Sequence, residues 1–130
     1  MNLVMTNPVT ITRALADDTR WRIVRLVTDD ALCVCELADI LNMPQSSVSS
    51  HVQVIRKAGL LESEKCEKWT YFRIVREHLP LVRAIFRHFA GEDPHPEDSA
   101  NAAKRLSKRE NSCCPGPKKL ATRRRSKTTP

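Results

Sequence analysis

"QSSVSSHVQVIRKA" occupies residues 45–58 and combines one apolar stripe with an otherwise polar surface. Val48, Val52 and Ile55 recur at the three- to four-residue spacing of a single helix face, and short polar side chains fill most other positions. Gly59 follows directly and is typical of the residue that ends a helix. The stretch therefore predicts an amphipathic helix that buries one face and presents serine, glutamine and histidine side chains on the other.

The segments around this helix predict its structural context. Apolar residues at helical spacing predict further helices at residues 9–16, 18–27, 35–41 and 78–90. Residues 60–65 and 69–75 are strand-like runs joined by a short turn. A helix, a turn, a polar-faced helix and a hairpin follow one another in winged helix-turn-helix domains. We therefore expect a mainly α fold with a small β-hairpin, whose very apolar last helix pairs with a partner chain or with the first helix.

The polar face of the central helix suggests a nucleic-acid partner. Short polar side chains on such a helix can contact base edges, and nearby cations can contact phosphates. A polar face alone is equally compatible with a solvated surface, but the hairpin that follows favours double-stranded DNA. The residues that we expect to contact DNA are Gln45, Ser46, Ser47, Ser49, Ser50 and His51 on the helix, Arg56 and Lys57 at its end, and Lys65 and Lys68 in the hairpin.

The 130-residue chain has a net charge of +7, and most of this charge lies near its C-terminus. Residues 1–90 contain 12 Lys and Arg against 10 Asp and Glu, whereas residues 91–130 contain 10 against 5. The second stretch holds many prolines and few large apolar residues, so it buries too little surface to offset the entropy of ordering. We expect a DNA-binding and dimerisation domain at residues 1–90 and a basic, disordered tail at residues 91–130.

Hydropathy and cysteine content predict a cytoplasmic protein without a membrane segment. No run approaches the roughly 20 apolar residues that a membrane span needs. The N-terminal residues also lack the basic and then apolar layout of a signal peptide. Five cysteines in a cytoplasmic chain favour ligand or redox roles over a disulfide framework.

Two of the cysteines lie one residue apart in "ALCVCELADIL" at residues 31–41. In an extended segment, side chains at positions i and i+2 point to the same side, so an extended run at 32–35 brings Cys33 and Cys35 together. Thiolates select soft, thiophilic ions, and the start of a helix favours the thiolate near neutral pH. The alternative is that both cysteines are small buried apolar residues.

Several of these stretches resemble the ArsR/SmtB family of metalloregulators: "ALADDTRWRIVRLV", "LCVCELADIL", "QSSVSSHVQVIRKAGLLESEK" and "KWTYFRI". The resemblance covers roughly residues 10–90. It implies a homodimeric winged-helix repressor that leaves its operator DNA when a metalloid binds. "LCVCEL" is similar to the site of the arsenite and antimonite sensors of the family, which implies Cys33 and Cys35 as ligands. Some members place a third cysteine three residues after the second, where this chain has Ala38.

Arsenite prefers three sulfur ligands, so a third thiol is expected from elsewhere in the chain. Cys66 falls at the tip of the hairpin, where we expect an exposed thiol beside the DNA and away from the other two. Cys113 and Cys114 lie in the tail, which can fold back, and we expect one of them to be the third ligand. His78 and His88 do not share a helix face at about 100° per residue, which disfavours a zinc site there.

Two other functions are compatible with part of this pattern. A redox-sensing winged-helix repressor would oxidise Cys33 and Cys35, or Cys113 and Cys114. A thiol oxidoreductase would need features that the sequence lacks: a βαβ pattern, a Cys-x-x-Cys motif, or a nucleophile with a base. We therefore expect a regulator with no organic cofactor and no enzymatic activity.

Overall fold

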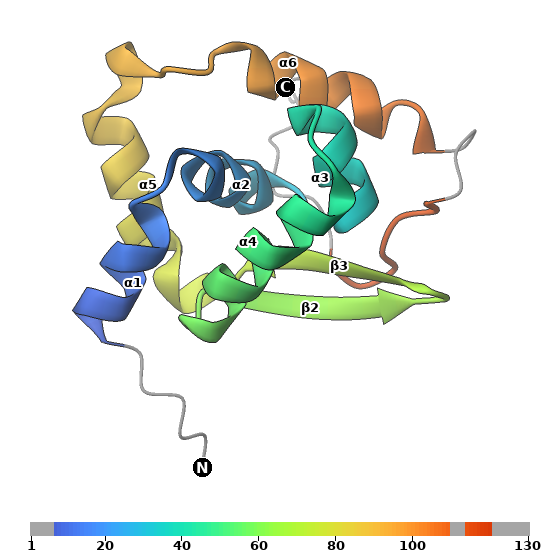
Figure 1. Cartoon of the computed structure of the whole chain (residues 1–130), viewed down its shortest axis with the longest axis horizontal. Coiled ribbons are helices and arrows are strands. Elements are labelled where there is room, and N and C mark those ends of the chain that lie inside the picture. Colours follow the sequence, from blue (N-terminus) through green and yellow to red (C-terminus); the bar gives the residue numbers. More distant parts are fainter. Residues whose placement is uncertain (1–6, 110–113, 121–130) are drawn as a thin grey trace, which may run out of the picture.

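The computed structural model describes residues 7–109 and 114–120, which form six α-helices and a three-stranded sheet (Figure 1). The helices are α1 (Pro8–Leu15), α2 (Asp18–Asp29), α3 (Val34–Leu41), α4 (Gln45–Lys57), α5 (Leu79–His88) and α6 (Glu97–Leu106). The strands are β1 (Leu32–Cys33), β2 (Leu61–Cys66) and β3 (Trp69–Ile74), and the short 3-10 helices η1 (Arg76–His78) and η2 (Ala90–Glu92) flank α5. None of the helices in these ranges is long and apolar enough to cross a membrane.

The turn between α3 and α4 is built by residues with special backbone preferences. Asn42 ends α3 in the left-handed conformation with φ 56°, which asparagine tolerates better than most residues. Pro44 is the N-cap of α4, and its φ of −62° is the value that its ring imposes. At the far end, Gly59 with φ 85° follows α4 as predicted. Asn42 and Pro44 separate α3 from α4, and Gly59 follows the end of α4, which gives the predicted helix-turn-helix.

The apolar stripe predicted for α4 is buried. Val48, Val52 and Ile55 are each no more than 1% exposed, and they join one core cluster with side chains from α2, α3, α5 and the sheet. Full burial of such a side chain is worth about 1.5–3 kcal/mol, so the three together fix which face of α4 turns inward. The serine-rich face consequently points away from the core.

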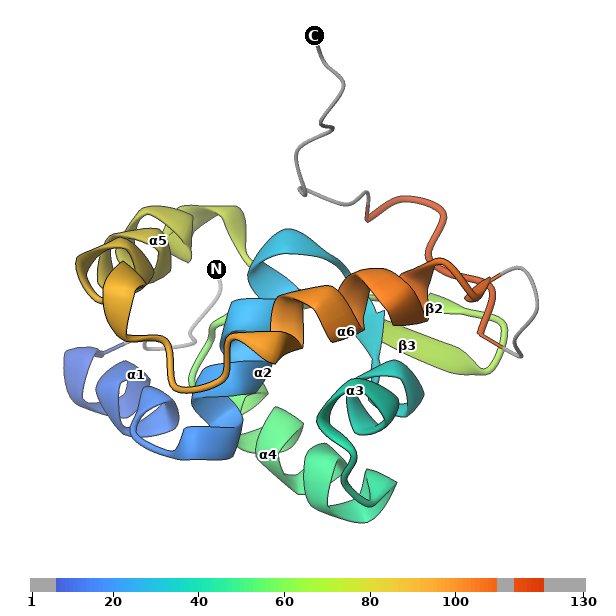
Figure 2. The ribbon, with the colours of Figure 1, turned by 90° about the horizontal axis from the view of Figure 1, so that it is seen from above.

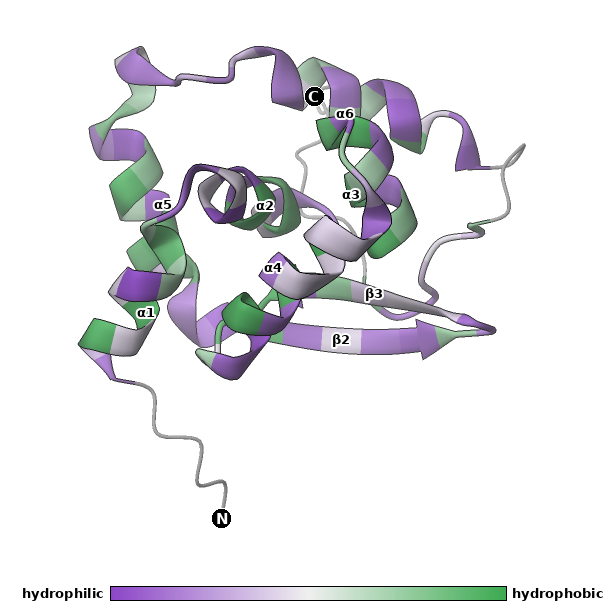
Figure 3. Cartoon of the chain, in the orientation of Figure 1, coloured by the Kyte–Doolittle hydropathy of each residue, from purple (hydrophilic) through white to green (hydrophobic). Residues whose placement is uncertain are grey.

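The two faces of the sheet belong to different clusters. The strands are antiparallel in the order β1-β3-β2, and side chains alternate between faces along each strand. Phe72 and its partner Leu32 face the main core, whereas Tyr71 and its partner Cys33 face the other side. This outer face carries a second cluster of buried residues: Ala31, Cys33, Cys66, Tyr71 and Cys114. Figure 3 shows that the edge strand β2 is largely hydrophilic.

The C-terminal part of the chain differs from the expected disordered tail. Helix α6 packs on α2 and α3 (Figures 1 and 2), with Ala102 fully buried in the main core. Residues 114–120 lie against the outer face of the sheet, where Cys114 is also fully buried. The expectation of disorder was wrong for residues 97–109 and 114–120, while residues 110–113 and 121–130 lie outside the described residues.

The last predicted helix, α5, packs on α2. Leu79 and Val82 are buried, and the ring of Phe86 meets the ring of Trp21 edge to face at 5.1 Å between centroids. Leu81 and Phe89 remain 42% and 46% exposed. Contacts within one chain therefore cover only part of the apolar surface of α5.

We expect Asp98→Asn to loosen α6, because the Asp98 carboxylate pairs with both Nε and Nη2 of Arg22 at 2.9 and 3.0 Å. The free energy of unfolding should fall by about 1–2 kcal/mol, between the values for exposed and buried ion pairs. Urea unfolding measures this loss. Glu97→Gln, at the neighbouring and exposed position, is the matched control and should change stability by less than about 0.5 kcal/mol. Equal losses in the two variants would contradict a specific role for the Arg22 contact.

Candidate functional site

Cys33 and Cys35 lie at the junction between a strand and a helix. Cys33 is extended, with φ −93° and ψ 169°, and it is both the end of β1 and the N-cap of α3. Cys35 lies two residues later in the first turn of the helix. The predicted extended run at 32–35 is present only at Leu32–Cys33, because the helix begins at Val34 rather than at the predicted Cys35. The change of backbone conformation between the two cysteines turns both thiols to one side.

A third thiol, that of Cys114, completes a cluster. The Sγ atoms of Cys33, Cys35 and Cys114 all lie within 4.8 Å of one another, and those of Cys33 and Cys114 are 3.6 Å apart. Thiolates that share one ion at ~2.3 Å in a tetrahedral arrangement lie ~3.8 Å apart, so the three sulfurs are already close to the spacing that one bound ion requires. Cys33 and Cys114 are buried and Cys35 is half-buried. Cys113 lies outside the described residues.

Cys66 is not the exposed thiol that the sequence suggested. It is buried at the end of β2, in the outer-face cluster with Trp69. It is not one of the three cysteines whose sulfurs gather within 4.8 Å. The expectation was wrong because residues 114–120, not solvent, cover this face of the hairpin.

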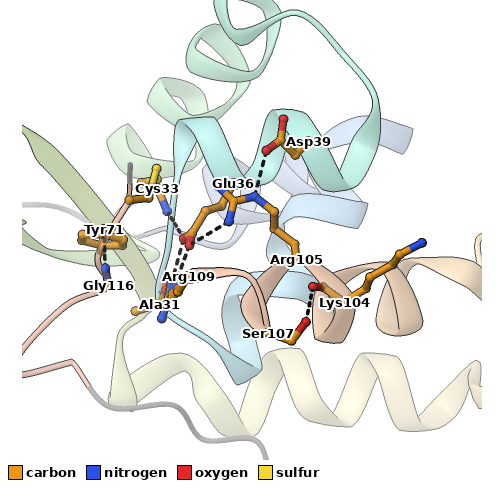
Figure 4. Close-up of polar contacts among 11 residues, drawn as sticks. Ala31, Cys33, Glu36, Asp39, Tyr71, Lys104, Arg105, Ser107, Arg109 and Gly116 are labelled. Atoms are coloured by element: carbon orange, nitrogen blue, oxygen red, sulfur yellow. Dashed lines mark hydrogen bonds and ion pairs between the residues drawn. The ribbon is translucent and has the colours of Figure 1, made fainter. Parts of the chain in front are cut away.

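A buried carboxylate lies beside the thiols (Figure 4). Glu36 is fully buried, and its side chain accepts a hydrogen bond from the backbone N–H of Cys33 at 3.2 Å. Arg109 donates to the two carboxylate oxygens at 2.6 and 2.8 Å and to the carbonyl of Ala31 at 2.8 Å. Desolvation opposes the charged guanidinium, yet the hydrogen bonds to Glu36 raise the pKa of Arg109 overall. The start of α3 and the C-terminal segment are thereby joined by a buried ion pair.

The thiol of Cys33 is protonated at neutral pH. Burial raises the pKa of Cys33 to about 11, and the nearby Glu36 carboxylate adds to this effect. The Glu36 backbone N–H at the helix start lowers this pKa, but by less than burial raises it. The expected thiolate at the start of α3 was therefore wrong for Cys33. Any ligand of this site has to displace the thiol proton.

Cys114 is held in place by contacts on its C-terminal side as well. Gly116 donates its backbone N–H to the hydroxyl of Tyr71 at 2.7 Å, and burial raises the pKa of Tyr71 to about 12. Gly116 has φ +97°, a backbone conformation that favours glycine, and a Cβ there would lie 3.1 Å from Nη1 of Arg109, which would have to shift slightly. The backbone N–H groups of Lys118, Lys119 and Leu120 all donate to Glu64 at 2.8 Å.

The residues expected to contact DNA lie on α4 and on the hairpin. Arg56 and Lys57 are exposed at the end of α4, and Lys65 and Lys68 are exposed on the hairpin. The ring of His51 has Nδ1 at 3.4 Å from Arg20 and 3.7 Å from Asp17. The polar residues on α4 are exposed or half-buried: Gln45, Ser46, Ser47, Ser49, Ser50 and His51. The fold brings none of these residues to the thiols, which lie at the opposite end of α3 from the α3–α4 turn.

Sequence reasoning missed Glu36, Arg109 and Tyr71 as neighbours of the thiols. One signal was available, because Glu36 stands three residues after Cys33, in the position of the acidic partner of a capping box. The sequence also contained a signal for helix α6. Glu97 and Asp98 lie in its first turn and basic residues lie in its last turn, a charge distribution that is typical of helices. The identity of Arg109 as the ion-pair partner carried no local signal.

Comparison with known proteins adds an independent line of evidence. Residues 17–63 match the family model described as bacterial regulatory protein, arsR family. The arsenic resistance transcriptional regulator ArsR1 of Pseudomonas putida is 37% identical over 88 residues, which span 67% of this chain and 68% of that protein. The arsenical resistance operon repressor of Escherichia coli is 38% identical over 78 residues, 59% of this chain and 66% of that protein.

Solved structures agree with the fold. HlyU from Vibrio cholerae superposes with a TM-score of 0.59 at 25% identity, covering 63% of this chain and 90% of that chain. The homodimeric winged helix-turn-helix DNA-binding domain Mb0332 from Mycobacterium bovis superposes with a TM-score of 0.57 at 26% identity. The match covers 68% of this chain and 81% of that chain. The predicted winged helix-turn-helix fold is confirmed.

Arg109→Gln removes the cation that is hydrogen-bonded to the buried Glu36 carboxylate and leaves only Arg105, at 4.0 Å. We expect the free energy of unfolding to fall by about 3 kcal/mol, the lower end of the range for breaking a buried ion pair, because Arg109 is 22% exposed. The double variant Glu36→Gln/Arg109→Gln should recover part of this loss, since a neutral amide costs less to bury than a charge.

A double-mutant cycle by urea unfolding measures the coupling between these two side chains. Arg105→Gln is the comparison: its hydrogen-bonded partner Asp39 at 2.8 Å is exposed and it reaches Glu36 only at 4.0 Å, so it should cost less than Arg109→Gln. If the changes in the free energy of unfolding for the Glu36 and Arg109 substitutions simply added up in the double variant, the two side chains would not be coupled.

Proposed function

This chain belongs to the ArsR family of bacterial regulatory proteins, and we propose that it is a repressor released from operator DNA by arsenite or antimonite. Its relatives and its fold are those of DNA-binding transcriptional regulators, not of enzymes. The observation that carries the metalloid proposal is the cluster of three thiols, those of Cys33, Cys35 and Cys114. The names of the relatives from Pseudomonas putida and Escherichia coli, both concerned with arsenic resistance, support the same effector.

The chemistry of trivalent arsenic suits a site made of three cysteine side chains. Arsenous acid, As(OH)₃, reacts with three thiols to give three As–S bonds and three water molecules. Each S–H proton leaves with one hydroxyl group, and the oxidation states of arsenic and sulfur do not change. A divalent cation brings no hydroxyl groups, so binding it to thiols releases the protons to solvent. Sulfur ligands also favour soft centres over hard ones.

The position of the cluster suggests how binding is transmitted. Cys33 and Cys35 begin α3, and α3 packs directly on α4. Drawing three sulfurs onto one ion moves the start of α3 relative to β1 and residues 114–120. A ligand shifts a conformational equilibrium only by its difference in affinity for the two forms. We therefore propose that the metalloid binds best to a form in which α4 is not placed for DNA.

The DNA complex that we propose uses two copies of the chain in the cytoplasm. The exposed face of α4 would enter the major groove, and Lys65 and Lys68 of the hairpin would contact the backbone. Val9 on α1, Leu81 on α5 and Phe89 directly after α5 are exposed apolar residues that a second copy can cover. The homodimeric relative from Mycobacterium bovis supports this arrangement. Two-fold proteins of this fold bind half-sites about one helical turn apart.

Redox sensing is a second candidate, favoured by the 3.6 Å separation of the Cys33 and Cys114 sulfurs. Hydrogen peroxide would oxidise these two thiols to a disulfide and be reduced to two water molecules. This pair differs from the pairs suggested by the sequence, Cys33 with Cys35 and Cys113 with Cys114. Arsenite release without any oxidant separates the two candidates.

We expect Cys33→Ser, Cys35→Ser and Cys114→Ser each to retain DNA binding and to lose release by arsenite. The arsenite concentration for half-release should rise at least about tenfold, equivalent to about 1.4 kcal/mol. Fluorescence anisotropy of a labelled operator measures the release. Cys66→Ser is the matched control, because Cys66 is buried in the same cluster but is not one of the three grouped thiols. An unchanged response in Cys114→Ser would contradict its role as a ligand.

X-ray absorption at the arsenic edge should show three sulfur neighbours in the full chain and two in Cys114→Ser. The sample has to be free of added thiols, because an exogenous thiol would fill the third position. Three sulfurs in both proteins would instead assign the third bond to another cysteine.

Substitutions on α4 and on the hairpin should affect DNA differently. Ser49→Ala and His51→Ala should weaken operator binding by about 1–3 kcal/mol each if these side chains contact bases. Lys68→Ala should weaken binding to all duplexes alike and lower the salt dependence by about one unit of slope. Anisotropy titrations on the operator and on an unrelated duplex measure both effects. A change of sequence preference in Lys68→Ala, with none in His51→Ala, would contradict the proposed orientation.

A further inference from the structure

Residues 114–120, here called the strap, follow the outer face of the hairpin (Figures 1 and 2). The strap is attached at three places along its length. Cys114 is buried against Cys33, Gly116 bonds to Tyr71 of β3, and three successive N–H groups bond to Glu64 of β2. The strap is therefore an additional layer of the wing, the hairpin that winged-helix proteins place beside DNA.

The attachment to Glu64 determines where two lysines lie. Lys118 and Lys119 donate their backbone N–H groups to this carboxylate, and both residues are exposed. Desolvation opposes the charged form of Glu64, but the hydrogen bonds from Leu120, Lys118 and Lys119 lower its pKa overall. Glu64 thus stays ionised, with its negative charge directed at the strap backbone.

The lysines of the strap join cations already on the wing. Lys65 and Lys68 are exposed on the same hairpin, whose tip also carries the exposed Glu67. Four lysines from two distant stretches of sequence consequently gather at one end of the molecule. A solvated basic patch without a partner is the competing explanation of this arrangement.

We propose that the strap is part of the DNA-binding surface, and that Lys118 and Lys119 contact phosphates of the duplex beside the wing. The proposal rests on the proposed function, because the partner is the DNA bound by α4. An ammonium group is a point charge on a flexible stem, which suits it to backbone contacts that carry no sequence information. These contacts add affinity for any duplex and position the wing on it.

The strap also carries the third thiol, four residues before the first of these lysines. A segment that gives one side chain to the metalloid and two to DNA is placed to respond to both ligands. Metalloid binding at Cys114 pulls the strap toward α3, and the strap is bonded to β2 and β3 by its own backbone. We infer that release from DNA acts through the wing as well as through α4.

The test compares the salt dependence of DNA affinity in the full chain and in Lys118→Ala/Lys119→Ala. Each phosphate contact contributes about 0.9 to the slope of log affinity against log salt, so the slope should fall by about one to two units per protomer. The loss should be the same on operator and on an unrelated duplex. The matched control is Lys104→Ala/Lys108→Ala, which removes two exposed lysines from α6 and the residues after it, on the side of α2 and α3 away from α4 (Figure 1).

Equal slopes for the two double variants would overturn the proposal, because net charge alone would then explain the affinity. An operator bound no better than the unrelated duplex would overturn the proposed function, while the slopes on that duplex still decide the role of the strap.

Tyr71→Phe tests whether the strap positions the lysines. It removes the hydroxyl that accepts from Gly116 and leaves every charge in place. We expect the slope to fall toward that of Lys118→Ala/Lys119→Ala, with the folded state checked by thermal unfolding. A folded Tyr71→Phe protein that keeps the full slope would contradict positioning by the strap.

Discussion

The burial of the Glu36 carboxylate is the constraint on which the rest of this structure depends. An ionised carboxylate with no exposed surface is costly unless a cation and hydrogen-bond donors accompany it. The backbone of Cys33 supplies one donor, and Arg109, 73 residues further along the chain, supplies the charge. Arg109 reaches Glu36 only if the chain after α5 folds back over α2 and α3. The same path delivers Cys114 to the start of α3, so the ion pair organises the thiol cluster without any contribution from sulfur.

The outer face of the sheet explains why the cluster is enclosed. Tyr71 places its hydroxyl next to the Gly116 backbone, and Cys66 and Trp69 extend the apolar surface toward the hairpin tip. Burial keeps the Cys33 thiol protonated and limits access to the side where Cys35 is half-exposed. A neutral metalloid hydroxide crosses such a boundary more readily than a hydrated dication, because it has no charge to desolvate. The burial of the thiol cluster therefore favours a neutral effector such as arsenous acid over a hydrated dication.

Local sequence patterns predicted the helices up to α5 and the hairpin, because the spacing of residues such as Val48, Val52 and Ile55 is itself local. Cys33 and Cys35 are close in the sequence, so their proximity was predicted too, although the extended run at 32–35 that the prediction used is present only at Leu32–Cys33. The pattern failed after Gly91, where Asp98 and Arg109 act through partners 76 and 73 residues away. Neither contact leaves a periodic signal, so composition alone suggested disorder. The predicted thiolate failed because burial of Cys33 depends on the strap, which the sequence did not place.

Cysteine is an uncommon N-cap residue, and at the start of α3 it suits a protein that changes conformation when a ligand binds. Serine, threonine, aspartate and asparagine cap helices best, and replacing them costs about 1 kcal/mol. Cys33 gives up part of that capping energy, and Glu36 compensates by accepting from the Cys33 backbone. The sulfur can therefore leave the helix terminus for an arsenic atom at little cost, while Glu36 and Arg109 keep the helix in register. Because coupling between two ligands is reciprocal, a site that releases DNA on binding metalloid must bind metalloid more weakly when DNA is present. Because the Cys33 side chain caps α3 only weakly, little free energy is needed to move from the DNA-bound form to the metalloid-bound form.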